Sequence, residues 1–369
     1  MNAAKLRALP FVALLLPLDF IVAVVILAAD LASLPWRFGR RWKDPGPVLD
    51  VTSVTIQILN WDGKHLLEEC LPSVMEAVRY HSARSGRQPE VLVVDNGSSD
   101  GSIEFLRTRF PEVRLLELGR NYGFSDGNNR GFPHVQTDIV VLLNNDMLVA
   151  PDFLQPLLKP FGEREVFAVT SQITFADPDR RREETGKTRA RFEGGFFRLW
   201  HAEISVEDEV RDSLPVFWVG GGSCAVDMRK LRSLGGFDSL YRPFYVEDAD
   251  ISWQAWKRGW QCLLAPASRV VHKHRGTTRP KYGDDFVENT IRRNQYLFIW
   301  KNVTSPGMIL GHLVQLPRIH GSAIMQKGAR FELRAYIRAL WRLPFAVLRR
   351  VSGIPEYWLC DSHVMRLTQ

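Results

Sequence analysis

The feature that most constrains the fold is a run of five aliphatic residues at positions 139–143, which ends in Asn144-Asn145-Asp146-Met147. Short aliphatic runs of this kind are typical of buried parallel strands, whose carboxyl ends bind ligands in α/β folds. A carboxylate at such a strand end is well placed to hold a metal ion on a diphosphate. Because Asn and Asp are also common turn formers, the motif alone fits an ordinary turn. Its neighbours favour a ligand site.

Strand-like and helix-like stretches alternate after the linker Asp44-Pro45-Gly46-Pro47. Alternation with short connections predicts an α/β fold with a mostly parallel sheet flanked by helices. We found no internal repeat. The expected strands are residues 54–59, 91–95, 113–118 and 139–144, and the expected helices are residues 64–81 and 102–110.

Composition limits the partners and the chemistry. The 369 residues are 45% hydrophobic, enough for one large core or two fused ones. A net charge of +7 favours acidic partners such as phosphates, anionic lipid or nucleic acid. The cysteines form no CxxC pair, which argues against a zinc site and a disulfide framework and fits a reducing compartment. They are Cys70, Cys224, Cys262 and Cys360.

The N-terminal residues 8–29 are apolar except for Asp19, and they are long enough to cross a hydrocarbon core of ~30 Å. The 14 Leu, Ile, Phe and Val residues of this segment outweigh the cost of one central Asp, about 3 kcal/mol. A transmembrane helix is therefore expected. Pro10 and Pro17 can kink it, so a helix lying in the membrane interface is the alternative. The run exceeds the usual apolar core of a cleaved signal peptide, about 7 to 15 residues.

Flanking charge predicts the orientation of this segment. Two basic residues precede it and four follow it, which places the bulk of the protein on the cytoplasmic side of the inner membrane. The basic residues are Lys5 and Arg7 before the segment and Arg37, Arg40, Arg41 and Lys43 after it.

Two further segments are rich in charge. Residues 177–191 mix acidic and basic side chains with little to bury, which predicts a solvated mobile loop rather than a phosphate clamp. Residues 307–324 are apolar but broken by Pro317. Arginines then recur every four residues beside an apolar stripe, which is typical of a helix on anionic membrane, although packing on the main domain is the alternative. These arginines are Arg330, Arg334, Arg338 and Arg342.

Two loops carry candidate donor-binding groups. Asp95 ends the second expected strand, in VVDNGSSDGS, where a carboxylate can accept hydrogen bonds from a base or ribose. The segment GRNYGFSDGNNRG, residues 119–131, is rich in Gly and Asn, so its backbone N–H groups can approach a phosphate closely. Each segment also fits a plain turn with helix caps. The sequence has no complete Walker G-x-x-x-x-G-K-[ST] motif, and no G-x-G-x-x-G follows the first strand.

Acidic and histidine side chains supply candidate catalytic groups. Glu247, Asp248 and Asp250 begin an expected helix after the aromatic, Gly-rich stretch LGGFDSLYRPFY. Clustered carboxylates raise one another's pKa toward the range of a general base, although acids in a first helical turn are also ordinary dipole partners. His272 and His274 end another strand and are candidate metal ligands.

These pieces, in this order, resemble the family 2 inverting glycosyltransferases of the GT-A fold, and are most similar to bacterial rhamnosyl and galactofuranosyl transferases of surface polysaccharide synthesis. The resemblance covers about residues 54–302. The motifs are VTIQILNWDG, VVDNGSSDGS, RNYGFSDGNNRG, VVLLNND, GGGSCAV, GGFDSLYRPFYVEDADISWQAWKRGW and VVHKHRGTT.

The resemblance implies a role for each matching residue. Asp248 would be the base, with Glu247 beside it, and Asp146 with His272 would hold Mg²⁺ or Mn²⁺. The nucleotide-sugar site would contain Asn60, Asp95, Asn121, Asn129, Asn144 and Asn145, and the acceptor site would contain Gly221, Gly222 and Trp253.

Two departures from the family pattern bear on the metal. Asn144 stands where an acid is commoner, so this site carries less negative charge and we expect weaker metal binding. Lys273 and Arg275 add positive charge around the histidines, which weakens the case for two histidine ligands.

The resemblance predicts transfer of a sugar from a nucleoside-diphosphate sugar to a glycan acceptor on a polyprenyl diphosphate, at a membrane. A catalytically silent glycolipid-binding scaffold is the alternative. Nucleic acid is not an expected partner, because no nucleic-acid module is recognised. The expected division is residues 1–44 as membrane anchor and linker, 52–303 as catalytic domain with halves 52–170 and 171–303, and 304–369 as a membrane-associated region.

Overall fold

The computed structural model describes residues 3–35, 44–175, 184–273 and 281–369. A nine-stranded sheet runs in the order β3-β2-β1-β4-β10-β6-β11-β5, and β9 pairs with β11. The strands are β1 Val54–Asn60, β2 Glu90–Asp95, β3 Arg114–Glu117, β4 Ile139–Asn144, β5 Met147–Val149, β6 Val166–Phe175, β9 Leu214–Pro215, β10 Ser223–Asp227 and β11 Gln261–His272.

The half of the sheet formed by β3, β2, β1 and β4 is parallel, and β10 joins it antiparallel to β4. Strands β1 and β4 are buried along almost their whole length, because helices cover both faces of the sheet. The mostly parallel α/β fold expected from the sequence is therefore confirmed.

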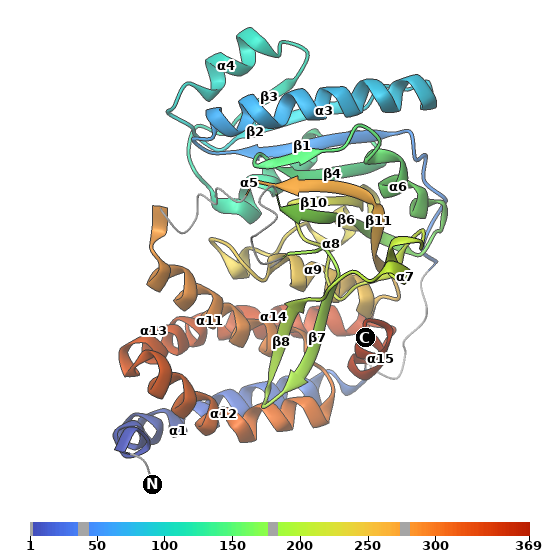
Figure 1. The fold of residues 1–369 in the computed structure, drawn as a ribbon. Coiled ribbons are helices and arrows are strands. Elements are labelled where there is room, and N and C mark those ends of the chain that lie inside the picture. Colours follow the sequence, from blue (N-terminus) through green and yellow to red (C-terminus); the bar gives the residue numbers. More distant parts are fainter. Residues whose placement is uncertain (1–2, 36–43, 176–183, 274–280) are drawn as a thin grey trace.

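Each face of the sheet has its own hydrophobic core (Figure 1). The upper face in Figure 1 packs on α3 Lys64–Ser85, α4 Ser102–Arg109 and α6 Leu154–Leu158. The lower face packs on α5 Gly123–Gly131, α8 Met228–Leu234 and α9 Glu247–Lys257. The helices predicted over residues 64–81 and 102–110 are found, and the first runs four residues further.

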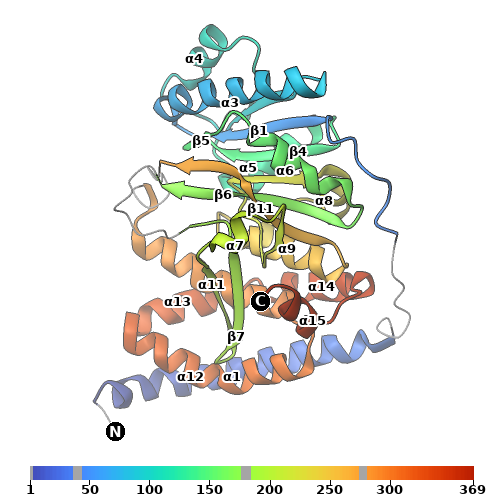
Figure 2. The same cartoon turned by 45° about the vertical axis from the view of Figure 1, so that its right-hand side comes forward.

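A helical layer lies below α9, at the base of the molecule (Figure 2). Leu15, Val22 and Ile26 of the N-terminal helix belong to the same hydrophobic core as α9 and the lower face of the sheet. The base and the predicted 304–369 region therefore share one core with the sheet. The layer contains α1 Ala3–Ala32, α11 Asp284–Asn302, α12 Pro306–Lys327, α13 Ala329–Leu340, α14 Leu343–Gly353 and α15 Asp361–Leu367.

The predicted mobile loop at 177–191 is corrected in part. Residues 188–191 belong to strand β7, Thr188–Glu193, which forms a hairpin with β8, Phe196–His201. This hairpin reaches the base, where Gly195 O lies 2.7 Å from His312 Nδ1 of α12. The strand forms because Ala190 and Phe197 enter the core, a contact that the charge pattern does not reveal. Residues 177–183 lie outside the described residues, and α7, Val206–Glu209, follows the hairpin.

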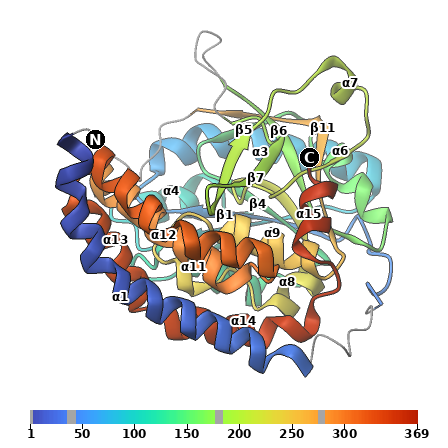
Figure 3. The same cartoon turned by 90° about the horizontal axis from the view of Figure 1, so that it is seen from below.

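The predicted N-terminal helix is found as α1. Among the described residues one helical segment, Ala8–Ala32, is long and apolar enough to cross a membrane. Figure 3 shows α1 running across the base beside α12, α13 and α14. The basic residues between 37 and 43 lie outside the described residues.

Candidate active site

The carboxyl ends of β1, β2 and β4 bring three predicted donor residues together. Asn60 and Asp95 are paired in the strand register, and Asn60 Nδ2 donates to Asp95 Oδ2 at 3.1 Å. Asn145 Nδ2 donates to Asn60 Oδ1 at 2.8 Å. Asp95 also accepts the backbone N–H groups of Gly97 and Ser98, so it holds the turn after β2 in place.

The Gly- and Asn-rich loop lies against this turn. Asn96 Nδ2 donates to Asn121 Oδ1 at 2.9 Å, and the same Asn121 oxygen accepts the Gly123 N–H at 2.7 Å where α5 begins. Gly97 has φ +80°, and a Cβ there would lie 2.4 Å from the Cα of Arg120. Only glycine allows this approach, so the two loops form one rigid edge.

Gly221 and Gly222, predicted for the acceptor, lie beside the donor residues. Asn144 N–H donates to Gly222 O at 2.8 Å, and a Cβ on Gly222 would lie 2.5 Å from Asn144 Nδ2. A Cβ on Gly221 would lie 3.1 Å from Phe124 of α5. The glycine pair therefore leaves room for the Asn144 side chain between β4 and β10.

Asp146 and His272, the predicted metal ligands, are in direct contact. His272 Nε2 lies 3.1 Å from Asp146 Oδ2, and His272 Nδ1 lies 3.0 Å from Glu184 Oε2. Burial lowers the pKa of His272, but the hydrogen bonds to Asp146 and Glu184 outweigh it and raise that pKa to about 9. His272 is thus an imidazolium held between two carboxylates. His274 lies outside the described residues.

These residues fit a divalent cation as part of a shared site. Asp146 Oδ1 is buried and has no hydrogen-bond partner among the described residues, so this oxygen can coordinate a cation. No group of three or more His, Cys, Asp or Glu side chains is placed to hold a metal within the described ranges. The remaining ligands of a cation at Asp146 would have to come from substrate and water.

Glu247 and Asp248 open α9 as candidate bases. Burial raises the pKa of Asp248 to about 6, despite its hydrogen bond from the Ala249 N–H, and the charge of Glu184 adds to the rise. Burial and the charge of Asp248 raise the pKa of Glu247 well above its ordinary value, which favours the protonated form of Glu247. Asp248 remains half-exposed whereas Glu247 is buried. Asp248 is therefore the carboxylate that a substrate hydroxyl can reach.

The segment before these acids has an unusual backbone that the sequence did not reveal. Tyr245 and Val246 have φ values of 70° and 78°, which only glycine adopts easily. Asn294 of α11 holds the segment by donating to the carbonyls of Tyr241, Phe244 and Tyr245 at 2.8 to 3.0 Å. Phe124 N–H at the start of α5 donates to Pro243 O at 3.3 Å. The segment before the candidate general base Asp248 is thus in direct contact with the Gly- and Asn-rich loop at residues 119–131.

Asp250 has a structural role. Its carboxylate is buried and accepts hydrogen bonds from Tyr241 OH at 2.7 Å, Lys301 Nζ at 2.6 Å and Asn302 Nδ2 at 2.7 Å. Lys301 also pairs with Asp238 at 2.8 Å. This network ties α9 to α11, and it leaves no free group for chemistry.

Two predicted site residues need correction. Trp253, expected at the acceptor, is fully buried among core aromatics, and its indole donates to the Asn302 carbonyl at 3.3 Å. Asn129, expected at the diphosphate, uses both polar atoms of its side chain on the backbone of Phe237. In both cases the helix turns the side chain away from the strand edge.

A group of aromatic rings lies beside the base and escaped the sequence analysis. Phe244 packs edge-on against both Tyr245 and Tyr282, with ring centroids 5.2 Å apart in each pair. Tyr282 also faces Trp61, and Lys281 lies 3.5 Å above the Trp61 ring. Rings from three distant segments meet here, a contact visible only after folding. Phe244 is buried, whereas Tyr245 and Tyr282 are exposed, and exposed rings of this kind are suited to the apolar faces of sugars.

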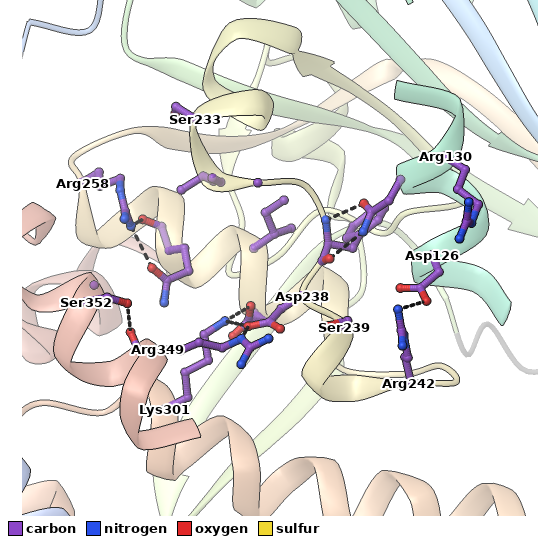
Figure 4. A pocket seen from close by; sticks show the side chains of 18 residues that line it. Asp126, Arg130, Ser233, Asp238, Ser239, Arg242, Arg258, Lys301, Arg349 and Ser352 are labelled. Atoms are coloured by element: carbon purple, nitrogen blue, oxygen red, sulfur yellow. Dashed lines mark hydrogen bonds and ion pairs between the residues drawn. The ribbon is translucent and has the colours of Figure 1, made fainter. Parts of the chain in front are cut away.

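A cavity of about 520 Å³ lies on another side of α9 (Figure 4). Its charges are largely paired, since Asp238 contacts Lys301 and Arg349, and Asp126 contacts Arg242. Asp95, Asp146 and Asp248 do not line it. The cavity is therefore separate from the candidate nucleotide-sugar site at the carboxyl ends of β1, β2 and β4.

The chain matches two family models. Residues 53–213 match the model described as "Glycosyl transferase family 2", and residues 139–359 match the model described as "Glycosyl transferase family group 2". The chain belongs to this glycosyltransferase family, and it is an enzyme. An N-acetylglucosaminyl-diphospho-decaprenol L-rhamnosyltransferase of Mycobacterium tuberculosis is 29% identical over 247 residues, which cover 61% of this chain and 76% of that protein. A polypeptide N-acetylgalactosaminyltransferase 8 of Drosophila melanogaster is 26% identical over 56% of this chain and 39% of its own length.

Solved structures agree on the GT-A fold of this glycosyltransferase. Residues 1–349 of S. aureus TarS superpose with a TM-score of 0.52 at 13% identity, over 82% of this chain and 83% of that one. GalNAc-T7, crystallised with UDP, GalNAc and Mn²⁺, gives a TM-score of 0.52 at 17% identity, over 69% of this chain and 48% of that one.

Proposed function

We propose that this glycosyltransferase moves a sugar, with inversion, from a nucleoside-diphosphate sugar to a hydroxyl of a polyprenyl-diphosphate-linked glycan. The observation that carries the proposal is the half-exposed Asp248, whose pKa is raised to about 6. It lies on a segment that contacts the start of α5, next to the donor edge. A carboxylate of this kind is ionised at neutral pH and still basic enough to accept a proton.

The donor would bind along the carboxyl edge of β1, β2 and β4. Asn60, Asp95 and Asn145 would contact the nucleoside, since their polar side chains meet there. The Asn121 loop and the first N–H groups of α5 would face the diphosphate. GalNAc-T7 binds UDP in a fold of the same kind, which supports this placement.

A divalent cation, Mg²⁺ or Mn²⁺, would be held by Asp146 and His272. When bound, it would neutralise charge on the departing diphosphate. The partnerless Oδ1 of Asp146 supports this assignment, as does the Mn²⁺ in the GalNAc-T7 structure. His272 must lose its proton to act as a ligand.

The proposed reaction is a single displacement. Asp248 accepts the proton of the acceptor hydroxyl while that oxygen bonds to the anomeric carbon. The bond between that carbon and the diphosphate oxygen breaks, and its electron pair leaves with the nucleoside diphosphate. Attack from the face opposite the leaving group inverts the anomeric centre. The raised pKa of Glu247 favours its neutral form, which avoids a second negative charge beside the base.

The lipid-linked acceptor and the membrane association are proposed from two observations, and the cytoplasmic face is proposed from the basic residues that flank the N-terminal apolar segment. The Mycobacterium tuberculosis relative is named for a diphospho-decaprenol acceptor. The apolar helix α1 and the arginines of α13 supply a means of membrane association. Both substrates would then meet at the cytoplasmic surface of the inner membrane.

The direct test is a screen of the purified protein against nucleotide sugars, with and without Mn²⁺ or Mg²⁺, scored by release of nucleoside diphosphate. The Asp248→Asn variant is the matched control. Acceptor-dependent release by the wild type alone supports the proposal. Donor binding without release by either protein would instead favour a glycolipid-binding scaffold, a reading that the reachable Asp248 disfavours.

A further inference from the structure

We infer that α1 lies in the plane of a single lipid leaflet as part of a flat docking face, and does not cross the bilayer. The docking face consists of the outward sides of α1, α12 and α14. The inference deepens the proposed function, since it defines how the enzyme meets its membrane.

The first observation is that α1 is held sideways against protein along its length. Asp19 Oδ1 lies 3.0 Å from His320 Nε2 of α12 and accepts the Tyr336 hydroxyl of α13 at 2.6 Å. Eleven residues later, about 16 Å along the helix, Asp30 forms a two-pronged ion pair with Arg350 of α14. Both acids of this apolar helix therefore face inward and are partnered.

The inner stripe of α1 is narrow. Leu15, Val22 and Ile26 are buried in the core shared with α9 and α11. Only 22% of the most apolar window of the segment is buried. The rest of the helix presents large aliphatic and aromatic side chains to the outside, so it still needs an apolar environment. These side chains are Leu9, Phe11, Leu14, Leu16, Phe20, Ile21, Val24, Leu27 and Leu31.

Neighbouring helices continue this apolar surface. Leu310 and Val314 of α12 and Phe345 and Leu348 of α14 are exposed. The views in Figures 1, 2 and 3 all place α1 and α12 at the base, running across the molecule below the catalytic sheet. Exposed apolar side chains on helices of this layer fit a lipid leaflet that lies against the base of the enzyme.

Charge identifies the occupant as a lipid surface with anionic headgroups. Between residues 306 and 355 the only acidic residue is Glu332, which is buried and bonded to Arg292 and His320. Exposed basic side chains lie on α12 at Arg318 and Lys327, the second of which pairs with Glu288 of α11, and on the adjoining α13 at Arg330 and Arg334. Within residues 306–355 the basic side chains thus outnumber the acidic ones, and an apolar face flanked by such an excess of basic side chains is complementary to an anionic leaflet.

A bilayer-crossing α1 conflicts with these contacts. If α1 crossed while keeping Asp19 and Asp30 bonded, α12, α13 and α14 would have to enter the hydrocarbon with it. Arg318, Arg330 and Arg334 would then be buried in lipid, which is strongly unfavourable. If α1 crossed alone, Arg350 would lose its carboxylate partner inside the protein.

Topology can be tested with the full chain and without reference to activity. Cys360 is exposed on the body of the protein, and the other three cysteines are buried, so Cys360 reports the side of the catalytic part. An Asn2→Cys variant adds a reporter at the other end of α1. Both are probed with a membrane-impermeant maleimide in spheroplasts and in inside-out vesicles. If α1 lies in the plane of the leaflet, the maleimide labels both cysteines in the same preparation. Labelling of the two cysteines in opposite preparations would overturn the inference.

The docking face is tested by flotation with vesicles that contain or lack anionic phospholipid. The Leu14→Glu/Phe20→Glu pair should reduce binding about tenfold or more, because it places charge on the embedded side. The control pair Val206→Glu/Val210→Glu changes equally exposed valines on and after α7 and should bind like wild type. Thermal unfolding checks that both variants fold. Equal binding by the two pairs, or binding that ignores anionic lipid, contradicts the proposed face.

Discussion

Buried charged side chains have different partners at the edge of the sheet that carries the catalytic residues and in the helical layer at the base of the molecule. At the edge, Asp146 Oδ1 and Glu247 Oε2 are buried without hydrogen-bond partners among the described residues. At the base, Asp30 and Glu332 are both paired with arginine, and Asp19 is bonded through Oδ1 to His320 and Tyr336, although its Oδ2 has no partner among the described residues. Unpartnered buried polar atoms cost stability, whereas paired ones fix the fold. The strand edge that carries the catalytic residues is therefore less stable than a fully paired site would be. The helical layer at the bottom of the molecule stabilises the fold that supports this edge.

The same contrast appears within α9, over two residues. Asp250 accepts hydrogen bonds from Tyr241, Lys301 and Asn302, whereas the Asp248 carboxylate accepts one from the adjacent Ala249 N–H. Variants at these two positions therefore test whether Asp248 serves the chemistry and Asp250 serves the fold.

The largest effect is expected from Asp248→Asn. Removing the base should lower kcat by about 10² to 10⁴, while donor binding is kept. The same change removes a charge that is only partly exposed to water and whose pKa is raised by burial, so the thermal unfolding temperature should rise. Steady-state kinetics, donor titration and thermal melts measure the three quantities. Turnover above roughly a tenth of wild type would place the base elsewhere, with Glu247 the next candidate.

Asp146→Ala should weaken donor binding in Mn²⁺ or Mg²⁺ by about 10- to 100-fold, and far less in EDTA, because its carboxylate acts through the ion. Donor titrations with and without metal measure this difference. Asp152→Ala, which removes an exposed acid just after β5, is the control. Wild-type activity that EDTA leaves unchanged would mean that Asp146 contacts the donor directly.

Asp250→Asn should act in the opposite direction to Asp248→Asn. Lys301 would keep Asp238 but lose one of its two carboxylate partners inside the protein. We expect a loss of about 2 to 3 kcal/mol in the free energy of unfolding, measured by chemical denaturation. If both Asn variants shift stability in the same direction, the contrast within α9 is wrong.

Asn294→Ala should lower kcat about tenfold and leave the KM for the donor unchanged, since it frees the segment that carries Asp248. Asn289→Ala is the matched control on the same helix, because Asn289 bonds to Phe331 and Arg338, away from that segment. A rise in donor KM, or an equal effect of both variants, would reduce Asn294 to a general support of the fold.

The sequence predicts the parts of this contrast that arise from local patterns. Strands β1, β2 and β4 are recognisable because their aliphatic runs are buried on both sides, and register then brings Asn60 beside Asp95. Trp253 is placed wrongly because the base layer covers α9, which makes an aromatic on it a core residue. The contacts of Asn294 with residues 241–245, and of Asp19 with His320, join segments about 50 and 300 residues apart. No local pattern reveals such pairings.

The smallest effect is a pH dependence in which activity and stability change in opposite directions. The pKa of Asp248 is raised from 3.8 to about 6, so between these two pH values the folded protein holds a proton that the unfolded chain releases. Stability from this group is therefore greatest below about pH 4 and falls as pH rises toward 6, whereas turnover should fall about tenfold for each pH unit below 6. Melts and kcat measured from pH 4 to 8 test both slopes, and Asp248→Asn should flatten its part of the stability slope. A wild-type kcat that stays constant down to pH 5 would mean that the proton acceptor has an ordinary carboxyl pKa, and that burial of Asp248 does not set the base.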